Sequence, residues 1–315
     1  MSQAPRVSFE FFPPGDTAMA EQLWEAVQRL APLDPDFVSV TYGADGSTRA
    51  RTHECVLRIR RETHLVVAPH LTCVGATCAE VLDIAASYWR EGIRHLVALR
   101  GDPPAPGGAV TSAASGAEKG DAAQPSATAT GAADGGYAHA ADLVAGLKGF
   151  AEFELSVAAY PEGHPETRTV EADIENLKRK LDAGATRAIT QFFFETDLFL
   201  RYRDRCAAAG LAVQLVPGIL PITRMPQLLR FAARCGADVP NWLRARFDGL
   251  EEDLVTRRLI AAHVAIEQCE RLRDHGVEEF HFYTLNRADL TYAICHALGL
   301  RPLAAEARTT AARVA

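Results

Sequence analysis

The sequence predicts an α/β fold, and a single-domain (β/α)8 TIM barrel fits it best. Eight short runs rich in β-branched and aromatic residues alternate with longer segments of helical period. This alternation is typical of parallel strands joined by helices. Eight such units in about 300 residues match the size of a (β/α)8 barrel. A doubly wound open sheet is the structural alternative.

The expected elements follow one another along the chain at regular intervals. The strands are expected at 6–12, 37–42, 65–72, 93–100, 153–160, 186–193, 212–218 and 279–284. Amphipathic segments between them are expected as helices, for example 21–30, 78–91 and 170–183. The stretch 236–278 is longer than one helix, so we expect it to hold two.

Two regions do not fit this alternation of strands and helices. Residues 103–136, after the fourth strand, are rich in small and polar residues, and Val110 is their only large aliphatic side chain. Such a composition buries too little apolar surface to order itself, so we expect a long disordered loop with little effect on chemistry. Its place directly after Asp102 also suits a lid. The barrel domain is therefore expected over 1–303, followed by a disordered tail at 304–315.

Composition and charge disfavour several functional classes. The net charge is -7 and the basic residues are scattered, which argues against a nucleic-acid partner. No apolar run reaches the length of a membrane span, and the N-terminus lacks the apolar core of a secretory signal. The seven cysteines include no Cys-x-x-Cys pair, and no tight metal-ligand spacing occurs. We therefore expect a cytoplasmic protein with reduced thiols, no metal and no membrane partner.

Glu10 is the most unusual residue of the first expected strand. It stands in the run VSFEFFPP at 7–14, where a carboxylate among phenylalanines is costly unless it is paired, hydrogen-bonded or protonated. The expected response is a raised pKa, which would make Glu10 a proton donor near neutral pH. The alternative is a strand-end glutamate that points at water, because Pro13 and Pro14 follow closely.

Polar residues gather at the C-terminal ends of all eight expected strands. A (β/α)8 barrel places its chemistry at this end. Each residue alone fits a cap or a turn, but together they predict a ligand pocket. The chain has no dinucleotide fingerprint, no P-loop and no nucleophile elbow.

Seven motifs, taken in order, resemble the bacterial methylenetetrahydrofolate reductase family. They are SFEFFPP at 8–14, FVSVTYG at 37–43, APHLT at 68–72, LRGD at 99–102, ITQFFF at 189–194, PGILP at 217–221 and HFYTLNR at 281–287. The resemblance runs from about residue 6 to residue 302. Any one motif is weak, whereas the ordered set is specific.

The resemblance implies a barrel that binds FAD and takes a hydride from NADH or NADPH, with NADH the expected donor. The hydride would reduce 5,10-methylenetetrahydrofolate to 5-methyltetrahydrofolate in a ping-pong scheme, serving one-carbon metabolism and methionine supply. Glu10 would be the general acid that opens the folate ring, and Asp102 would stabilise the resulting cation. The resemblance also implies a homo-oligomer, either a dimer or a tetramer.

The same resemblance implies the binding residues. The folate contacts would be Gln191, Gln227, Phe231, Tyr283 and Arg287, with Phe231 stacking on an aromatic ring. The flavin contacts would be Thr41, His70, Arg100, Gly101, Asp102, Tyr160, His164, Asp173, Arg179 and Lys180. Arg179 and Lys180 suit a pyrophosphate, although without the resemblance their residue types would favour a solvated helix face. Two other functions stay open: a flavin barrel that oxidises proline, and a folate- or flavin-binding protein without catalysis.

Overall fold

The computed structural model describes residues 4–42, 46–101, 135–167, 169–222 and 224–303. Most of the loop expected at 103–136 lies outside the described residues, and so do Asp102 and the expected tail at 304–315. The described chain resumes at Gly135, whose carbonyl accepts a hydrogen bond from the Cys78 N–H at 3.1 Å.

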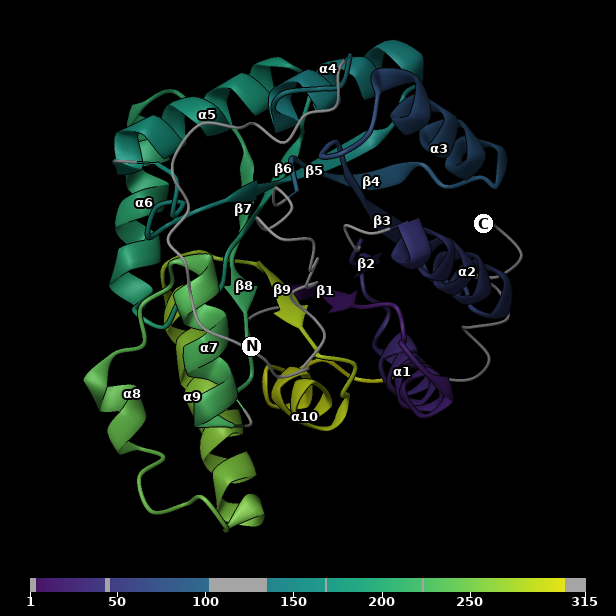
Figure 1. Cartoon of the computed structure of the whole chain (residues 1–315). Coiled ribbons are helices and arrows are strands. Elements are labelled where there is room, and N and C mark those ends of the chain that lie inside the picture. The colour runs from purple at the N-terminus through teal and green to yellow at the C-terminus, as the bar shows by residue number, and fades with distance from the viewer. Residues whose placement is uncertain (1–3, 43–45, 102–134, 168, 223, 304–315) are drawn as a thin grey trace.

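Parallel strands form the centre of the molecule, and helices cover their outer side (Figure 1). The strands are β1 (Arg6–Phe11), β2 (Phe37–Val40), β3 (Val67–Thr72), β4 (His95–Leu99), β5 (Glu154–Ala159), β6 (Arg187–Thr190), β7 (Gln214–Val216), β8 (Gly218–Ile219) and β9 (Glu279–Tyr283). Their order in the sheet is β7-β6-β5-β4-β3-β2-β1-β9-β8. The first and last strands of the chain therefore pair with each other, as a barrel requires and an open doubly wound sheet does not.

Pro217 divides the expected seventh strand into β7 and β8. Proline has no N–H to donate to a ladder, so β7 pairs with β6 while β8 pairs with β9. The Pro217 carbonyl still accepts the His281 N–H at 3.0 Å. Gly218 follows because an added Cβ would lie 2.2 Å from the Thr190 carbonyl oxygen. The interrupted strand closes the ring, and the predicted fold class is confirmed.

Helices follow most of the strands along the chain, and α10 follows the last one. They are α1 (Thr17–Leu30), the 3-10 turn η1 (Ala31–Leu33), α2 (Gly46–Glu62), α3 (Cys78–Arg90), α4 (Ala140–Phe150), α5 (Val170–Asp182), α6 (Thr196–Ala208), α7 (Met225–Cys235), α8 (Asn241–Ala245), α9 (Leu254–Asp274) and α10 (Asp289–Ala297). The two helices expected within 236–278 are confirmed as α8 and α9. Across the part of the chain that the structure describes, no helix combines the length and apolarity that crossing a bilayer demands.

Alternation along β1 separates the two sides of the barrel wall. Val7, Phe9 and Phe11 are buried in the large apolar cluster that includes side chains of the surrounding helices. Ser8 and Glu10 alternate with them, so they face the barrel interior. The same period of two therefore directs apolar side chains toward the helices and polar ones toward the axis.

An ion cluster closes the N-terminal end of the barrel, and we call it the floor cluster. Its members are the first residues of their strands: Arg6, Glu154, Arg187, Gln214 and Glu279. The Arg187 guanidinium lies 2.6 Å from a Glu154 oxygen and 3.3 Å from a Glu279 oxygen. Glu279 also lies 2.8 Å from Arg6 and accepts from the Gln214 amide. The floor is thus a network of paired charges, with the Glu279 side chain only 4% exposed.

Candidate active site

Glu10 lies near the C-terminal end of β1, next to Tyr283 of β9 and Ser39 of β2 in the sheet register. Its side chain is 18% exposed. Glu10 therefore points into the upper barrel and not into bulk water.

Two histidines face the Glu10 carboxylate, and the three residues form what we call the rim cluster. Glu10 Oε2 lies 3.3 Å from His70 Nε2 and 3.6 Å from His281 Nε2. Both distances exceed those of a compact charge-assisted hydrogen bond. The other ring nitrogen of His281, Nδ1, shares a hydrogen bond of 2.8 Å with Ser8 Oγ. That bond fixes the ring, which is fully buried, and aims Nε2 at Glu10.

The expectation of a raised pKa for Glu10 is wrong. Burial alone would raise the pKa of Glu10, but the imidazoles of His281 and His70 outweigh burial and hold that pKa at about 2. Burial lowers the pKa of His281, which favours its neutral ring. In the free protein at neutral pH Glu10 is therefore a carboxylate, and a proton that it donates must first reach it from elsewhere.

Tyr283 lies beside the rim cluster. Its hydroxyl donates a hydrogen bond to the Thr190 carbonyl at 2.7 Å, and its ring crosses that of His281 with centroids 5.4 Å apart. Burial raises the pKa of Tyr283 well above its usual value, so the phenol stays neutral. Gln191 follows Thr190 directly, so this hydrogen bond brings two of the expected folate residues, Gln191 after β6 and Tyr283 at the end of β9, close together.

A pocket of about 220 Å³ opens between α1, α7 and the loop before α10. Its lining includes three of the expected folate residues, Gln227, Phe231 and Arg287. Met19 and Gln22 of α1 also line it, and the sequence patterns did not single them out. The pocket combines an aromatic face, an amide and a guanidinium, which suits a flat ligand with an anionic tail.

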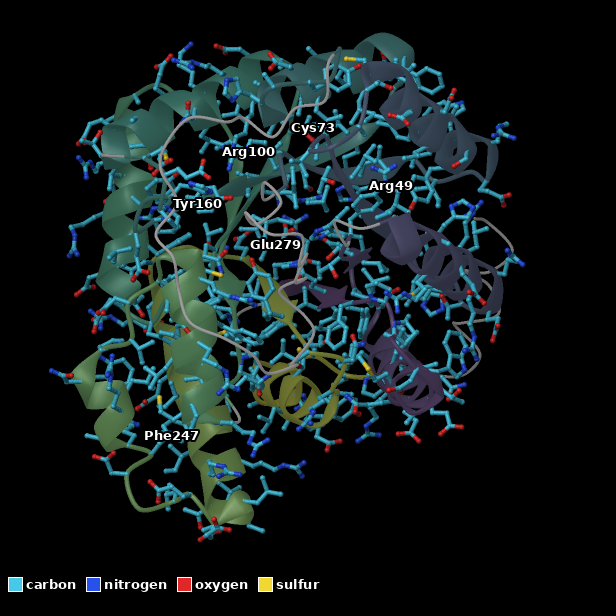
Figure 2. All side chains as sticks on the ribbon, viewed as in Figure 1. Arg49, Cys73, Arg100, Tyr160, Phe247 and Glu279 are labelled. Carbon is cyan, nitrogen blue, oxygen red and sulfur yellow. The ribbon has the colours of Figure 1, made fainter. Side chains whose placement is uncertain are left out.

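The expected flavin residues lie on another part of the rim. Arg100 and Tyr160 follow the neighbouring strands β4 and β5 (Figure 2). The rings of Tyr160 and His164 meet edge to face, 4.7 Å apart. The His164 N–H donates to Asp173 Oδ2 at 2.7 Å, which ties this loop to α5. Gly101 has φ +87°, and an added Cβ would lie 2.7 Å from Val74 Cγ1, so only glycine fits there.

Lys180 provides the test of whether an anionic cofactor fits this part of the rim. Its Nζ donates to the Ala158 carbonyl at 2.8 Å, and burial lowers the pKa of Lys180 to about 8. Among the described residues, no carboxylate oxygen lies within ion-pair distance of Nζ, so no ion pair there neutralises the ammonium. Arg100 adds a guanidinium that pairs with Glu166 at 2.6 Å. These donors fit the pyrophosphate of the flavin that the resemblance implies.

The structure does not bring every expected flavin residue into this group. Arg179 is 63% exposed and lies 3.7 Å from Glu175 on the same helix. Thr41 and His70 lie nearer Glu10, since Thr41 donates its N–H to the Phe11 carbonyl at 2.9 Å. Asp102 lies outside the described residues.

Sequence reasoning missed Ser8 and His281 as members of the site. Both are polar residues within apolar strands, and each stands two positions from a residue that was chosen, Glu10 or Tyr283. A period of two places such pairs on one face of a strand, and that was the available signal.

Comparisons with known proteins agree on one family. A family model described as methylenetetrahydrofolate reductase matches residues 1–299. The 5,10-methylenetetrahydrofolate reductase of Pectobacterium carotovorum subsp. carotovorum is 50% identical, and that of Escherichia coli 48% identical, each over 94% of this chain and 91% of the relative. Methylenetetrahydrofolate reductase (NADH) 1 of Arabidopsis thaliana is 32% identical over 93% of this chain and 48% of its own length.

The fold also occurs among solved structures, of which the following is an example. It is an uncharacterized protein from Clostridium thermocellum described as binding two copies of 5-methyl-5,6,7,8-tetrahydrofolic acid. It matches this chain with a TM-score of 0.59 and 13% sequence identity, and the match covers 95% of both chains.

Proposed function

The chain belongs to the methylenetetrahydrofolate reductase family, and on that premise we propose that it reduces 5,10-methylenetetrahydrofolate to 5-methyltetrahydrofolate. The hydride donor is NADH, or alternatively NADPH, and the two substrates react in turn at one site. FAD, when bound, would supply the redox chemistry by carrying the hydride between the two substrates. The observation that carries the proposal is the Glu10 carboxylate held between His70 and His281 at the catalytic end of a barrel. Family membership leaves a proline-oxidising barrel without support.

Glu10 is proposed as the group that protonates the folate. The five-membered ring of the substrate opens to a cationic iminium only when its leaving nitrogen takes a proton. Glu10 is ionised in the free protein, so it must take up a proton before it can donate one. His70 is proposed to relay that proton, since its Nε2 lies 3.3 Å from Oε2, whereas the neutral ring of His281, 3.6 Å away, orients the carboxylate. A carboxylate that receives and then donates one proton in a mostly buried site is a general acid. Asp102 is proposed as the carboxylate that stabilises the iminium.

The folate is proposed to lie across the rim from the Glu10 cluster to the pocket beside α7. Gln191 and Tyr283 would contact the pterin end. Phe231 would stack on an aromatic ring, Gln227 would bond the same body, and Arg287 would pair with a carboxylate of the tail.

The flavin is proposed to lie along the ends of β2 to β5, with its pyrophosphate near Lys180. The residues that would hold it are Thr41, His70, Arg100, Gly101, Asp102, Tyr160, His164, Asp173, Arg179 and Lys180. As in the family, the active form is proposed to be a cytoplasmic homo-oligomer, either a dimer or a tetramer.

The half-reactions of a Glu10→Gln variant test this proposal. Folate-dependent reoxidation of the reduced flavin should slow by roughly 10²–10⁴-fold, the usual effect of losing a general acid. Reduction of the flavin by NADH should stay near the wild-type rate, because it needs no protonated carboxylate. Glu152→Gln is the matched control, since Glu152 is 86% exposed in the loop between α4 and β5 and is not part of the rim cluster. Equal loss in both half-reactions would reduce Glu10 to a structural role.

A further inference from the structure

The loop between β9 and α10 carries two consecutive non-glycine residues in the left-handed region. Leu285 has φ +50° and Asn286 has φ +54°. Asparagine tolerates this conformation, but for leucine it costs roughly 1–2 kcal/mol. Such backbone persists only where the surrounding contacts determine it, and it concentrates at functional sites. The hydrogen bonds that this loop makes therefore indicate why the strained conformation is kept.

The side-chain amide of Asn286 hydrogen-bonds to the end of β1 through both its oxygen and its nitrogen. We call this pair of bonds the clamp. Its Oδ1 accepts the Phe12 N–H at 3.0 Å, and its Nδ2 donates to the Phe12 carbonyl at 2.9 Å. The residue is 1% exposed, so these bonds do not compete with water. The Asn286 carbonyl in turn accepts from Gln22 Nε2 at 3.0 Å, which anchors the loop to α1. The amide thus extends the β1–β9 pairing past the end of the ladder.

Thr284 hydrogen-bonds to the backbone of Glu10, the proposed proton donor. Its Oγ1 donates to the Glu10 carbonyl at 2.6 Å, and its N–H reaches the same oxygen at 3.3 Å. The Asn286 N–H donates to Thr284 Oγ1 at 3.1 Å, which fixes the orientation of that hydroxyl. The loop therefore hydrogen-bonds to the backbone on both sides of Phe11, at Glu10 and at Phe12.

The same loop also leads into the folate pocket. Phe12, Thr284, Asn286 and Arg287 all line it. One short segment therefore sets the position of the β1 end that carries Glu10 and of the guanidinium proposed to hold the folate tail.

We infer that Asn286 is a positioning residue, which acts through Glu10 by fixing the proton donor relative to the folate. The inference rests on the proposed function. Both polar atoms of the Asn286 amide are hydrogen-bonded to Phe12, and an amide does not titrate near neutral pH, so Asn286 does not exchange the proton itself. The left-handed backbone is what turns its amide back onto β1.

Removal of the clamp should mainly slow the folate half-reaction. A misplacement of about 1 Å between reacting groups costs on the order of 10²-fold in rate. For Asn286→Ala we therefore expect a fall of about 10- to 100-fold in folate-dependent flavin reoxidation. NADH-dependent flavin reduction should stay within about threefold, since it does not use Glu10.

Asn286→Gly is the companion variant, because glycine adopts φ +54° without strain and should fold where alanine fails. Both variants should show faster hydrogen exchange at the Phe12 amide, which reports release of the clamp independently of turnover. Asp34→Gly is the matched control, since Asp34 also has a positive φ, +52°, at the end of η1. Unchanged exchange at Phe12 in both Asn286 variants would overturn the inference.

A double-mutant cycle with Glu10→Gln decides between positioning and a general structural role. If Asn286 acts through Glu10, then Asn286→Gly should change the folate half-reaction by less than about threefold once Glu10 is already glutamine. Fully multiplicative losses would overturn the inference and leave the proposed function intact. A Glu10→Gln variant that slows both half-reactions equally would overturn the proposed role of Glu10 and the inference together.

Discussion

The two ends of the barrel both hold a buried carboxylate between cationic or basic side chains, yet they suit different tasks. In the floor cluster, Glu279 faces the guanidinium groups of Arg187 and Arg6. In the rim cluster, Glu10 faces the imidazoles of His70 and His281. A guanidinium keeps its proton at any physiological pH, whereas an imidazole can exist with or without its second proton. The guanidinium charges of the floor are therefore fixed, and the rim is the end that we propose carries the proton transfer.

The largest expected effect comes from breaking the floor cluster. Arg187→Met leaves Glu279 buried next to a single remaining arginine, and loss of one partner of a buried pair costs about 3–5 kcal/mol. Denaturant unfolding should report this loss, while the turnover of the folded fraction changes little. Adding Glu279→Leu to Arg187→Met should restore most of the stability. A variant that keeps its stability but loses turnover would reverse the assignment of the two ends.

Changes at the rim should affect substrate binding and turnover more than stability. Phe231→Ala removes the aromatic face of the pocket, and we expect the KM for the folate to rise about 10- to 50-fold, equivalent to about 1.4–2.3 kcal/mol. Steady-state kinetics at fixed NADH would measure it. Phe231→Leu should fall between wild type and alanine, because it keeps apolar bulk without the ring. An unchanged folate KM would place the substrate elsewhere on the rim.

His95 begins β4 in register with Glu154 of the floor cluster, and charges of both Arg187 and His281 act on it. Burial lowers the pKa of His95 to about 3, with Arg187 and His281 adding to the effect, and its Nε2 shares a hydrogen bond of 2.8 Å with Ser156 Oγ. A folded-state pKa below the unfolded value of about 6.5 means that the contribution of His95 to stability is present above that pH. It declines as the pH falls from 6.5 toward 3, by up to about 1.4 kcal/mol per pH unit.

His95→Asn should therefore flatten the dependence of unfolding free energy on pH between 6.5 and 5. Unfolding curves at a series of pH values would measure the slope. His263→Asn, at a site where the side chain is 58% exposed, provides the surface control. A slope unchanged by His95→Asn would mean that other groups, such as His281, account for the acid sensitivity.

The strands and helices could be predicted because local patterns determine them. Apolar, β-branched runs locate each strand to within a few residues, and the length of 236–278 is enough to expect two helices. The division at Pro217 was missed, although proline cannot donate to a ladder, because the run around it still reads as one strand.

The chemistry of the rim was predicted less well because it depends on contacts between distant residues. Glu10 was found from its own neighbours, but its pKa is set by His70 and His281, which only the closed barrel brings to it. The same holds for Asn286, whose sequence context suggests a turn and whose amide in fact pairs with Phe12. Patterns in sequence locate such residues, whereas their partners require the fold.

The central claim is that this chain passes a hydride from a nicotinamide to a folate through a bound flavin. An anaerobic visible spectrum of the purified protein, recorded before and after NADH and again after 5,10-methylenetetrahydrofolate, tests it most directly. The account predicts a flavin band that bleaches with NADH and returns with the folate. A band that bleaches and does not return, or a protein that stays colourless after incubation with FAD, would contradict it.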